Sequence, residues 1–420
     1  MVIKITTWNI KWFGQLLQGY TRTIPRQGKK VTKKADKALQ KLQLKQIAEE
    51  IRQINSDILC IQEGPSVGNV QRLEKFCTEY LEDDWSVIVR DDNDPWLISG
   101  VQGIFFLVKS SRLNSWQPRL MSQSLWIEAT EFESRVDKNV VDSGEHKRKW
   151  PIIHPQFKPD KPETFPEPID EDEGSESEIK LNDREHNHYR HPQVLLLTIN
   201  GKRVDIIGCH LKSKFGGELF EDAARARADG VATGALTDEQ RELILKVEQT
   251  AVESRIKLST EITNVRYYID SRFRNEPDPI VFVVGDLNDG VGKEAFERKY
   301  LFHDLVSNIQ GNVFLANRFL NHALFDFSRD NEENHRWTSY FIDLWDPARK
   351  PEILLDHILF TQSVSGESAL KKSGIGVLQG AGRVEHAIHN SVNSVFGSSA
   401  DFTSDHRPVT VDVELKTIFT

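Results

Sequence analysis

Short apolar runs that end in turn residues recur along most of the chain. Runs of this length are typical of sheet strands, and alternation of apolar and polar positions indicates a strand with one buried face. The pattern predicts strands at 2–7, 57–62, 85–90, 103–109, 193–199, 203–210, 279–285, 352–360 and 407–413. The pair Asn200-Gly201 lies between two of these runs, and this dipeptide strongly favours a hairpin turn.

Two stretches have the spacing of an amphipathic helix instead. The first contains Leu44, Ile47, Ala48 and Ile51, and the second contains Leu258, Ile262, Val265 and Ile269. The second helix is expected over 238–271 because Thr237-Asp-Glu-Gln240 resembles a capping box. Many strands with a few helices predict an α/β fold: a four-layered α/β sandwich of two packed, mostly antiparallel sheets flanked by helices.

The segment 151–188 breaks this pattern, because it is rich in proline and acidic residues. It has too little apolar surface to offset the entropy of ordering. We therefore expect a disordered insertion on the surface of a single domain that spans residues 1–420.

Composition narrows the class of protein. The 420 residues are 38% hydrophobic and 28% charged, and no apolar stretch approaches the roughly 20 residues of a membrane helix. The N-terminal residues form a predicted strand without the pattern of a secretory signal, so we expect a cytoplasmic protein unless a signal has been removed. We also expect a monomer. The scattered residues Cys60, Cys77 and Cys209 are expected to be buried thiols. A net charge of -9 disfavours a surface coated with cations for DNA, although an enzyme needs only a local basic pocket.

Six apolar runs end in, or are followed by, Asn, Asp, Glu or His, and these segments are the candidates for chemistry. They are Trp8-Asn9, Gln62-Glu63, Cys209-His210-Leu211-Lys212-Ser213, Gly285-Asp286-Leu287-Asn288, Leu355-Asp356-His357 and Ser404-Asp405-His406-Arg407-Pro408. Each alone is a weak signal, because such residues also form caps and turns.

In their order and combination these segments resemble the motifs of the endonuclease/exonuclease/phosphatase superfamily, which includes deoxyribonuclease I and bacterial sphingomyelinases. The resemblance runs from residue 9 to residue 406 and leaves out 151–188 and 361–400. It implies a hydrolase of phosphate esters in which Glu63 is the main metal ligand, beside Asn9 and Asp405. Oxygen ligands of this kind suit Mg²⁺ or Mn²⁺ and not zinc.

The resemblance also implies a water-activating base. That base is His406, with Asp356 orienting its ring, because a histidine near its ordinary pKa accepts a proton at neutral pH. Asp286 is the alternative base, and the choice between Asp286 and His406 stays open. Asn288 is expected to position the phosphate or to stabilise its developing charge.

Two further residues are implied on the substrate side. His210 is expected to protonate the leaving oxygen, as in the deoxyribonuclease and sphingomyelinase branches. Arg190 resembles the cation that those branches aim at the substrate phosphate, although a solvated arginine is the ordinary interpretation. His357 follows Asp356 in a strand, so its side chain should point to the opposite face and be structural.

Three functions remain open at this stage. The leading hypothesis is a nuclease acting on DNA or RNA, with the basic loop 26–34 and nearby Trp12, Phe13 and Tyr20 contacting the strand. The alternatives are a phosphodiesterase or phosphatase of lipid headgroups or small molecules, and a non-catalytic scaffold. Gly64-Pro65 replaces the Thr-Lys of abasic-site endonucleases, and the Trp-Cys-Asp-Arg-Ile signature of inositol polyphosphate phosphatases is absent near 356. Both of those classes are disfavoured.

Overall fold

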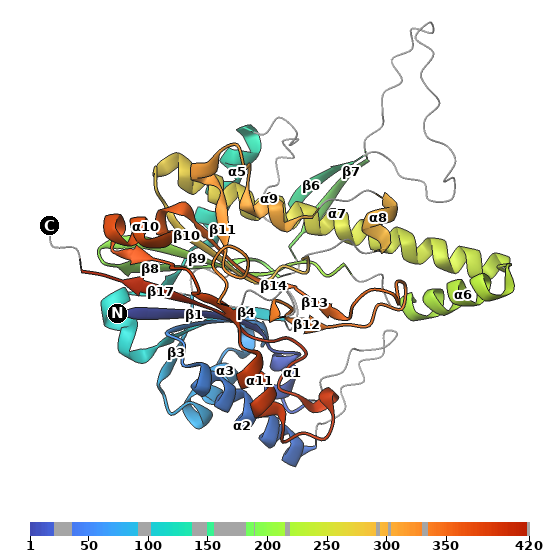
Figure 1. The fold of residues 1–420 in the computed structure, drawn as a ribbon, viewed down its shortest axis with the longest axis horizontal. Helices are drawn as coiled ribbons and strands as arrows, with labels where there is room; N and C mark the ends of the chain where they lie inside the picture. The colour runs from blue at the N-terminus through green and yellow to red at the C-terminus, as the bar shows by residue number, and fades with distance from the viewer. Residues whose placement is uncertain are drawn as a thin grey trace, which may run out of the picture.

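Two large sheets lie face to face, and helices cover both outer faces (Figure 1). The computed structural model describes residues 1–20, 36–90, 102–136, 149–154, 182–188, 190–214, 219–290, 295–300, 304–329 and 335–417. The predicted four-layered α/β sandwich is confirmed by this arrangement. No helix in these described ranges is long and apolar enough to span a membrane.

The first sheet has the order β15-β17-β1-β2-β4-β3, with β16 also paired to β17. Its strands are β1 (Val2–Asn9), β2 (Ile58–Gly64), β3 (Trp85–Ile88), β4 (Gly103–Lys109), β15 (Ile375–Gly376), β16 (Gly382–Val384) and β17 (Val409–Leu415). Only β1 and β2 are parallel, and the other neighbours are antiparallel.

The second sheet has the order β11-β14-β10-β9-β8-β5 and again one parallel pair, β9 with β10. Its strands are β5 (Arg119–Leu120), β8 (Gln193–Ile199), β9 (Lys202–His210), β10 (Ile280–Asp286), β11 (Leu320–His322) and β14 (Asp356–Thr361). Asn200 and Gly201 both have positive φ, 51° and 70°, in the tight turn between β8 and β9. The predicted hairpin is confirmed.

Alternation along the strands divides the core into layers. In β10, Phe282 and Val284 belong to the cluster between the two sheets, whereas Val281 and Val283 pack with residues of α7. This follows from the period of two, which sends successive side chains to opposite faces. A strand with both faces covered is apolar throughout, as 280–284 is.

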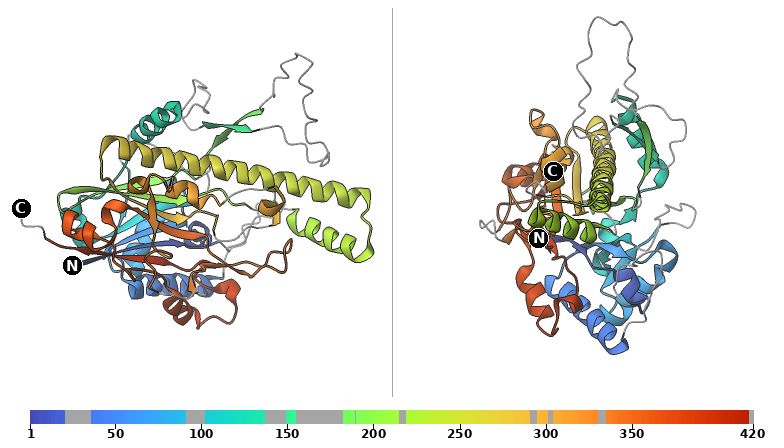
Figure 2. Two further views of the ribbon diagram at one scale, coloured as in Figure 1. Left: turned by 45° about the horizontal axis from the view of Figure 1, so that its top comes forward. Right: turned by 90° about the vertical axis from the view of Figure 1, so that its right-hand side faces the viewer.

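Helices α2 (Lys37–Ile54) and α3 (Gln71–Tyr80) cover the first sheet, and α5 (Gln123–Val136) and α7 (Asp238–Asn275) cover the second. Helix α7 runs the length of the sandwich and beyond it, where α6 (Phe220–Thr233) folds back along it (Figure 2). The shorter helices are α1 (Phe13–Leu17), α4 (Leu113–Trp116), α8 (Ala295–Tyr300), α9 (Val306–Gln310), α10 (Gly366–Ser373) and α11 (His386–Asn393).

Some predicted boundaries were wrong. The expected strand 352–360 is two strands, β13 (Glu352–Ile353) and β14, because β13 pairs outside the main sheets with β12 (Ser339–Tyr340). Strand β17 begins at Val409 and not at residue 407, after Pro408, which has no N–H for the ladder. The flanks of the predicted insertion form a separate pair, β6 (Lys149–His154) and β7 (Asn182–Asn187). Residues 155–181 and the basic loop 26–34 lie outside the described residues.

Candidate active site

Sheet topology brings the predicted strand ends to one edge of the sandwich. β1 and β2 are parallel, so Asn9 and Glu63 lie at the same end of the first sheet. β9 and β10 are parallel too, and their register pairs His210 with Asp286. The antiparallel strand β14 starts at this edge, because Asp356 pairs with Asp286.

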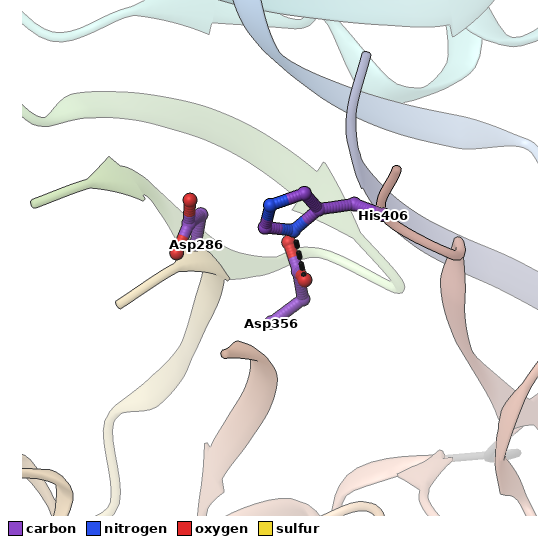
Figure 3. A group of neighbouring side chains, drawn as sticks. All are labelled: Asp286, Asp356 and His406. Atoms are coloured by element: carbon purple, nitrogen blue, oxygen red, sulfur yellow. Dashed lines mark hydrogen bonds and ion pairs between the residues drawn. The ribbon is translucent and has the colours of Figure 1, made fainter. Parts of the chain in front are cut away.

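A short hydrogen bond joins a histidine and a carboxylate at this edge. His406 Nδ1 lies 2.6 Å from Asp356 Oδ2 (Figure 3). A carboxylate only accepts hydrogen bonds, so Nδ1 carries the proton and the other ring nitrogen faces the side of Asp286. Thr338 Oγ1 accepts hydrogen bonds from the backbone N–H groups of Leu355 and Asp356, at 3.0 and 3.1 Å, and so fixes the position of Asp356.

Asp286 connects three other predicted residues. Its Oδ2 accepts a hydrogen bond from Asn9 Nδ2 at 2.9 Å and lies 3.6 Å from His210 Nε2. Its Oδ1 accepts a hydrogen bond from the backbone N–H of Asn288 at 2.9 Å. The carboxylate is therefore held between the two sheets, because Asn9 comes from the first sheet and Asp286 from the second.

The loop before β17 is tied to the end of β1. Ser404 Oγ donates to Asn9 O at 2.6 Å and accepts from the backbone N–H groups of Lys11 and His406, both at 3.1 Å. Trp8 Nε1 donates to His406 O at 3.1 Å. These bonds place His406 over the junction of the two sheets.

Glu63 has a backbone conformation that side chains rarely adopt. Its φ is 59°, and the pairing of β2 with β4 is irregular between Ile61 and Gly64. An irregularity of this kind re-aims a side chain at the end of a strand. Glu63 Oε2 accepts a hydrogen bond from the backbone N–H of Trp12 at 2.6 Å, which orients the carboxylate.

The proton equilibria differ from those of free side chains. Burial lowers the pKa of His406, but Asp356, Asp286 and Asp405 outweigh it and raise the pKa to about 10. Burial and the charge of Asp356 raise the pKa of Asp286 to about 7. Burial, with help from Arg190 and His406, lowers the pKa of His210 well below its ordinary value. His210 is thus neutral and His406 carries the positive charge, unlike the histidine near its ordinary pKa that the sequence led us to expect. In this state Asp286, the alternative base, is the group that can accept a proton.

The carboxyl groups of Glu63 and Asp405 are close enough to influence each other electrostatically. Burial raises the pKa of Glu63, and the negative charge of Asp405 raises it further. Asp405 Oδ2 lies 3.1 Å from Lys11 Nζ in an ion pair whose side chains are 45% and 32% exposed. This pair is partly open to solvent, so a cation can compete for Asp405.

Arg190 lies next to His210, but most of its donors already have partners. Its Nε donates to His210 O at 3.0 Å, one Nη to Leu211 O at 2.7 Å and the other Nη to Gln102 Oε1 at 2.6 Å. Asn288 Nδ2 also donates to Leu211 O, at 2.9 Å. Arg190 therefore holds the backbone that follows β9.

The donor set fits a hard divalent cation. Asn9 Oδ1 is buried and has no hydrogen-bond partner, which is costly unless a ligand completes it. Together with Glu63 and Asp405 it would offer oxygen donors of the kind that suits Mg²⁺ or Mn²⁺. Ligand atoms of Asp286, Asp356 and His406 also lie within 4.8 Å of one another. In that second group His406 Nδ1 is already bonded to Asp356, so we interpret the group as proton-handling.

Several residues of the site gave no signal in the sequence or were interpreted wrongly. Thr338 and Trp8 hold Asp356 and His406 in place, and neither was predicted. Phe13 was expected near a nucleic acid, but it is fully buried and packs edge-on against Phe76. His357 bonds to His322 and to the carbonyl of Asp289, in the structural role expected for it.

A comparison with solved structures gives alignments at low sequence identity. TDP2 from C. elegans aligns with a TM-score of 0.43 and 12% identity, covering 99% of this chain and 76% of that one. SmcL aligns with a TM-score of 0.41 and 13% identity, covering 99% of both chains.

A protein of the endonuclease/exonuclease/phosphatase family from Bacteroides thetaiotaomicron aligns with a TM-score of 0.37 and 10% identity, covering 99% of this chain and 98% of that one. No family model matches the sequence. No curated protein matches it either. The chain itself shows the expected sandwich of two sheets flanked by helices.

Proposed function

We propose that this protein is a Mg²⁺- or Mn²⁺-dependent phosphodiesterase, and that it acts as a nuclease through in-line attack of an activated water. One observation carries the proposal: four strand ends from the two sheets and the loop before β17 bring together Asn9, His210, Asp286, Asp356 and His406. A scaffold without catalytic activity would have no need of a buried, oriented histidine–carboxylate pair.

Glu63, Asn9 and Asp405 would hold the cation. A divalent ion held there would supply positive charge against the charge that develops on a phosphate oxygen. Two features support these ligands: the N–H of Trp12 orients the carboxylate of Glu63, and the buried Oδ1 of Asn9 has no hydrogen-bond partner.

The remaining residues handle protons and position the phosphate. We assign the activation of the attacking water to Asp286 or His406, and Asp356 keeps the ring of His406 in one orientation. His210 is neutral in the free protein, and the negative charge of a bound phosphate would favour its protonated form, from which it protonates the leaving oxygen. Asn288 and Arg190 fix the backbone at Leu211, and we assign both side chains to the positioning of the phosphate.

The direct test is hydrolysis of single-stranded DNA, plasmid DNA, RNA, sphingomyelin and bis(p-nitrophenyl) phosphate with Mg²⁺, Mn²⁺ or EDTA. We expect metal-dependent cleavage that is lost in Asp286→Ala, the control for contaminating enzymes. Absence of hydrolysis of every diester by pure, folded protein with either metal would refute the proposal.

A leaving-group experiment separates the two histidines. Positioned acid or base catalysis contributes about 10²- to 10⁴-fold, so His210→Ala and His406→Ala should each lose activity of that order on a nucleotide diester. A p-nitrophenolate leaving group needs no proton, so it should largely restore His210→Ala and leave His406→Ala impaired. Equal recovery of both variants would show that His210 is not the acid.

A further inference from the structure

Arg407 immediately follows His406 and has no role in the site described above. Its guanidinium stacks over the ring of Trp337, with Cζ 3.9 Å from the ring centroid. Its Nε is buried without a hydrogen-bond partner, and its side chain makes no hydrogen bond or ion pair within the described part of the chain. Burial lowers the pKa of Arg407 to about 10, and the nearby charges of Glu50 and Asp405 oppose this shift.

Unsatisfied guanidinium donors are unusual, because a half-buried cation normally has a carboxylate or carbonyl partner. Arg383, in strand β16, shows the ordinary arrangement, with bonds to Glu385 and Asp412 at 2.9 and 2.8 Å. Arg190 is likewise bonded through three nitrogens. Arg407 is therefore a cation beside His406 whose side-chain donors have no partner among the described residues.

The segment that carries Trp337 also borders the catalytic pair. Thr338 binds the backbone of Asp356, and Ser339 forms a bridge to His406. Trp337 is held on one side by Arg407 and contacts His386, whose ring centroid is 4.6 Å away. Residues 337–339 are thus held in place along one side of the site.

Beyond Ser339 the same segment exposes large apolar side chains. Tyr340 is 52% exposed, Phe341 42% and Ile342 60%. The segment is anchored at both ends, because β12 pairs with β13 and Trp345 packs between Phe220 and Phe296. Figure 1 shows this hairpin reaching from the site towards α6. Consecutive exposed aromatic residues held in place by the fold mark a binding surface.

We propose that Arg407 binds a second phosphate of a single-stranded polynucleotide and that Tyr340 and Phe341 stack on its bases. The inference rests on the proposed phosphodiesterase activity and names its substrate class. An available guanidinium for the backbone beside exposed aromatic rings for the bases is the combination that single strands require. Arg407 follows His406 in the chain, and Tyr340 follows Ser339, which forms a bridge to His406. The strand would therefore run from the scissile phosphate along this segment.

The phosphate contact and the stacking contacts can be tested separately by the binding of a fluorescent single-stranded decanucleotide. Binding is measured by anisotropy, and Asp286→Ala is present in every variant to prevent cleavage. Arg407→Gln should weaken binding about tenfold or more at low salt. It should also reduce the slope of log Kd against log salt by about 0.7, the value for one lost phosphate contact on a single strand. Arg407→Lys should restore the slope.

Tyr340→Ser with Phe341→Ser should weaken binding about 5- to 100-fold and leave the salt slope unchanged. The controls are Arg225→Gln, an exposed arginine of α6 paired with Asp222, and Phe314→Ser, a ring that is 91% exposed. Phe314 precedes β11, which pairs with the end of β14 farthest from Asp356. Neither control should change binding.

Hydrolysis distinguishes failure of this inference from failure of the proposed function. With active-site residues intact, each test variant should lose at least tenfold more kcat/KM on the decanucleotide than on bis(p-nitrophenyl) phosphate, which has one phosphate and no base. If the parent cleaves the small diester but Arg407→Gln binds the decanucleotide as Arg225→Gln does, the subsite is wrong. The parent could instead bind sphingomyelin vesicles and not the decanucleotide, with vesicle binding lost in the Tyr340 and Phe341 variant. That result would show that the surface binds lipid and not a polynucleotide. No cleavage of any diester would instead refute the activity.

Discussion

A buried polar network holds the chain just before Asp405 and His406. Glu50, from α2, is fully buried and accepts hydrogen bonds from His389 Nδ1 at 2.8 Å and from Thr403 Oγ1 at 2.7 Å. Asn393 donates to Thr403 Oγ1 at 2.8 Å and accepts from the backbone N–H of Thr403 at 2.6 Å. Helices α2 and α11 are thereby coupled to the loop that carries the candidate base.

The substitution Thr403→Val keeps the shape of this side chain and removes its hydroxyl. Glu50 loses a donor and Asn393 loses an acceptor, and an unsatisfied buried group costs about 1–3 kcal/mol. Since Asn393 Nδ2 keeps its bond to His389 O, we expect a loss near the middle of this range, roughly 2 kcal/mol, in the free energy of unfolding. Because misplacement by about 1 Å can cost 10²-fold in rate, kcat should fall about tenfold or more.

A matched control separates stability from positioning. Thr361 is also fully buried, donates to Pro279 O at 2.7 Å and accepts from the N–H of Val281 at 3.1 Å, but it lies at the other end of β14 from Asp356. Urea unfolding of Thr361→Val should show a similar loss of stability, with kcat close to the parent's at a temperature where both are folded. If the two variants lose the same fraction of kcat, the network does not position the loop.

Two further predictions concern the metal and the backbone. Glu63→Ala should weaken Mn²⁺ binding and lose activity that excess Mn²⁺ partly restores; calorimetric titration showing the parent's affinity would contradict the ligand assignment. Gly285→Ala should destabilise the protein by about 3 kcal/mol or more in urea unfolding, because φ is 139° and the new Cβ would lie 2.0 Å from Cys209 O. Gly201→Ala, with φ of 70° and open space around it, is the milder control, expected to cost about 1 kcal/mol.

Much of this fold is predictable because its strands have local signatures. The run 280–284 is apolar because both of its faces are covered, and Asn200-Gly201 forms the turn that its backbone preference favours. The boundary within 352–360 was missed because Leu354 and Leu355 continue the apolar run, while the break comes from Thr338 bonding the backbone. These hydrogen bonds join residues that are 17 and 18 positions apart in the sequence, so no local sequence pattern predicts them.

The site was predictable as a set of strand ends, whereas its supporting contacts were not. Parallel pairing of β1 with β2 and of β9 with β10 brings the motif residues together. The order of the motifs along the chain was therefore enough to predict which residues form the site. The burial of Phe13 had a signal that was not used, because Leu16 and Leu17 follow it at helical spacing. The free donors of Arg407 depend on which groups fold against it, and this information is only in the tertiary structure.

Backbone strain gives an independent indication of where function is concentrated. Among the described residues, positive φ at non-glycine positions occurs at Trp12, Asn55, Glu63, Glu82, Asp83, Gln117, Asn200 and Asn288. Asn55 and Gln117 end helices, Asn200 forms a hairpin, and Glu82 and Asp83 form the turn before β3. The other three are Trp12, whose N–H holds Glu63, then Glu63 itself, and Asn288, whose N–H holds Asp286. Glycine at these positions would relieve the strain, which costs about 1–3 kcal/mol at each, but at Glu63 and Asn288 it would also remove the side chain on which the proposed chemistry depends.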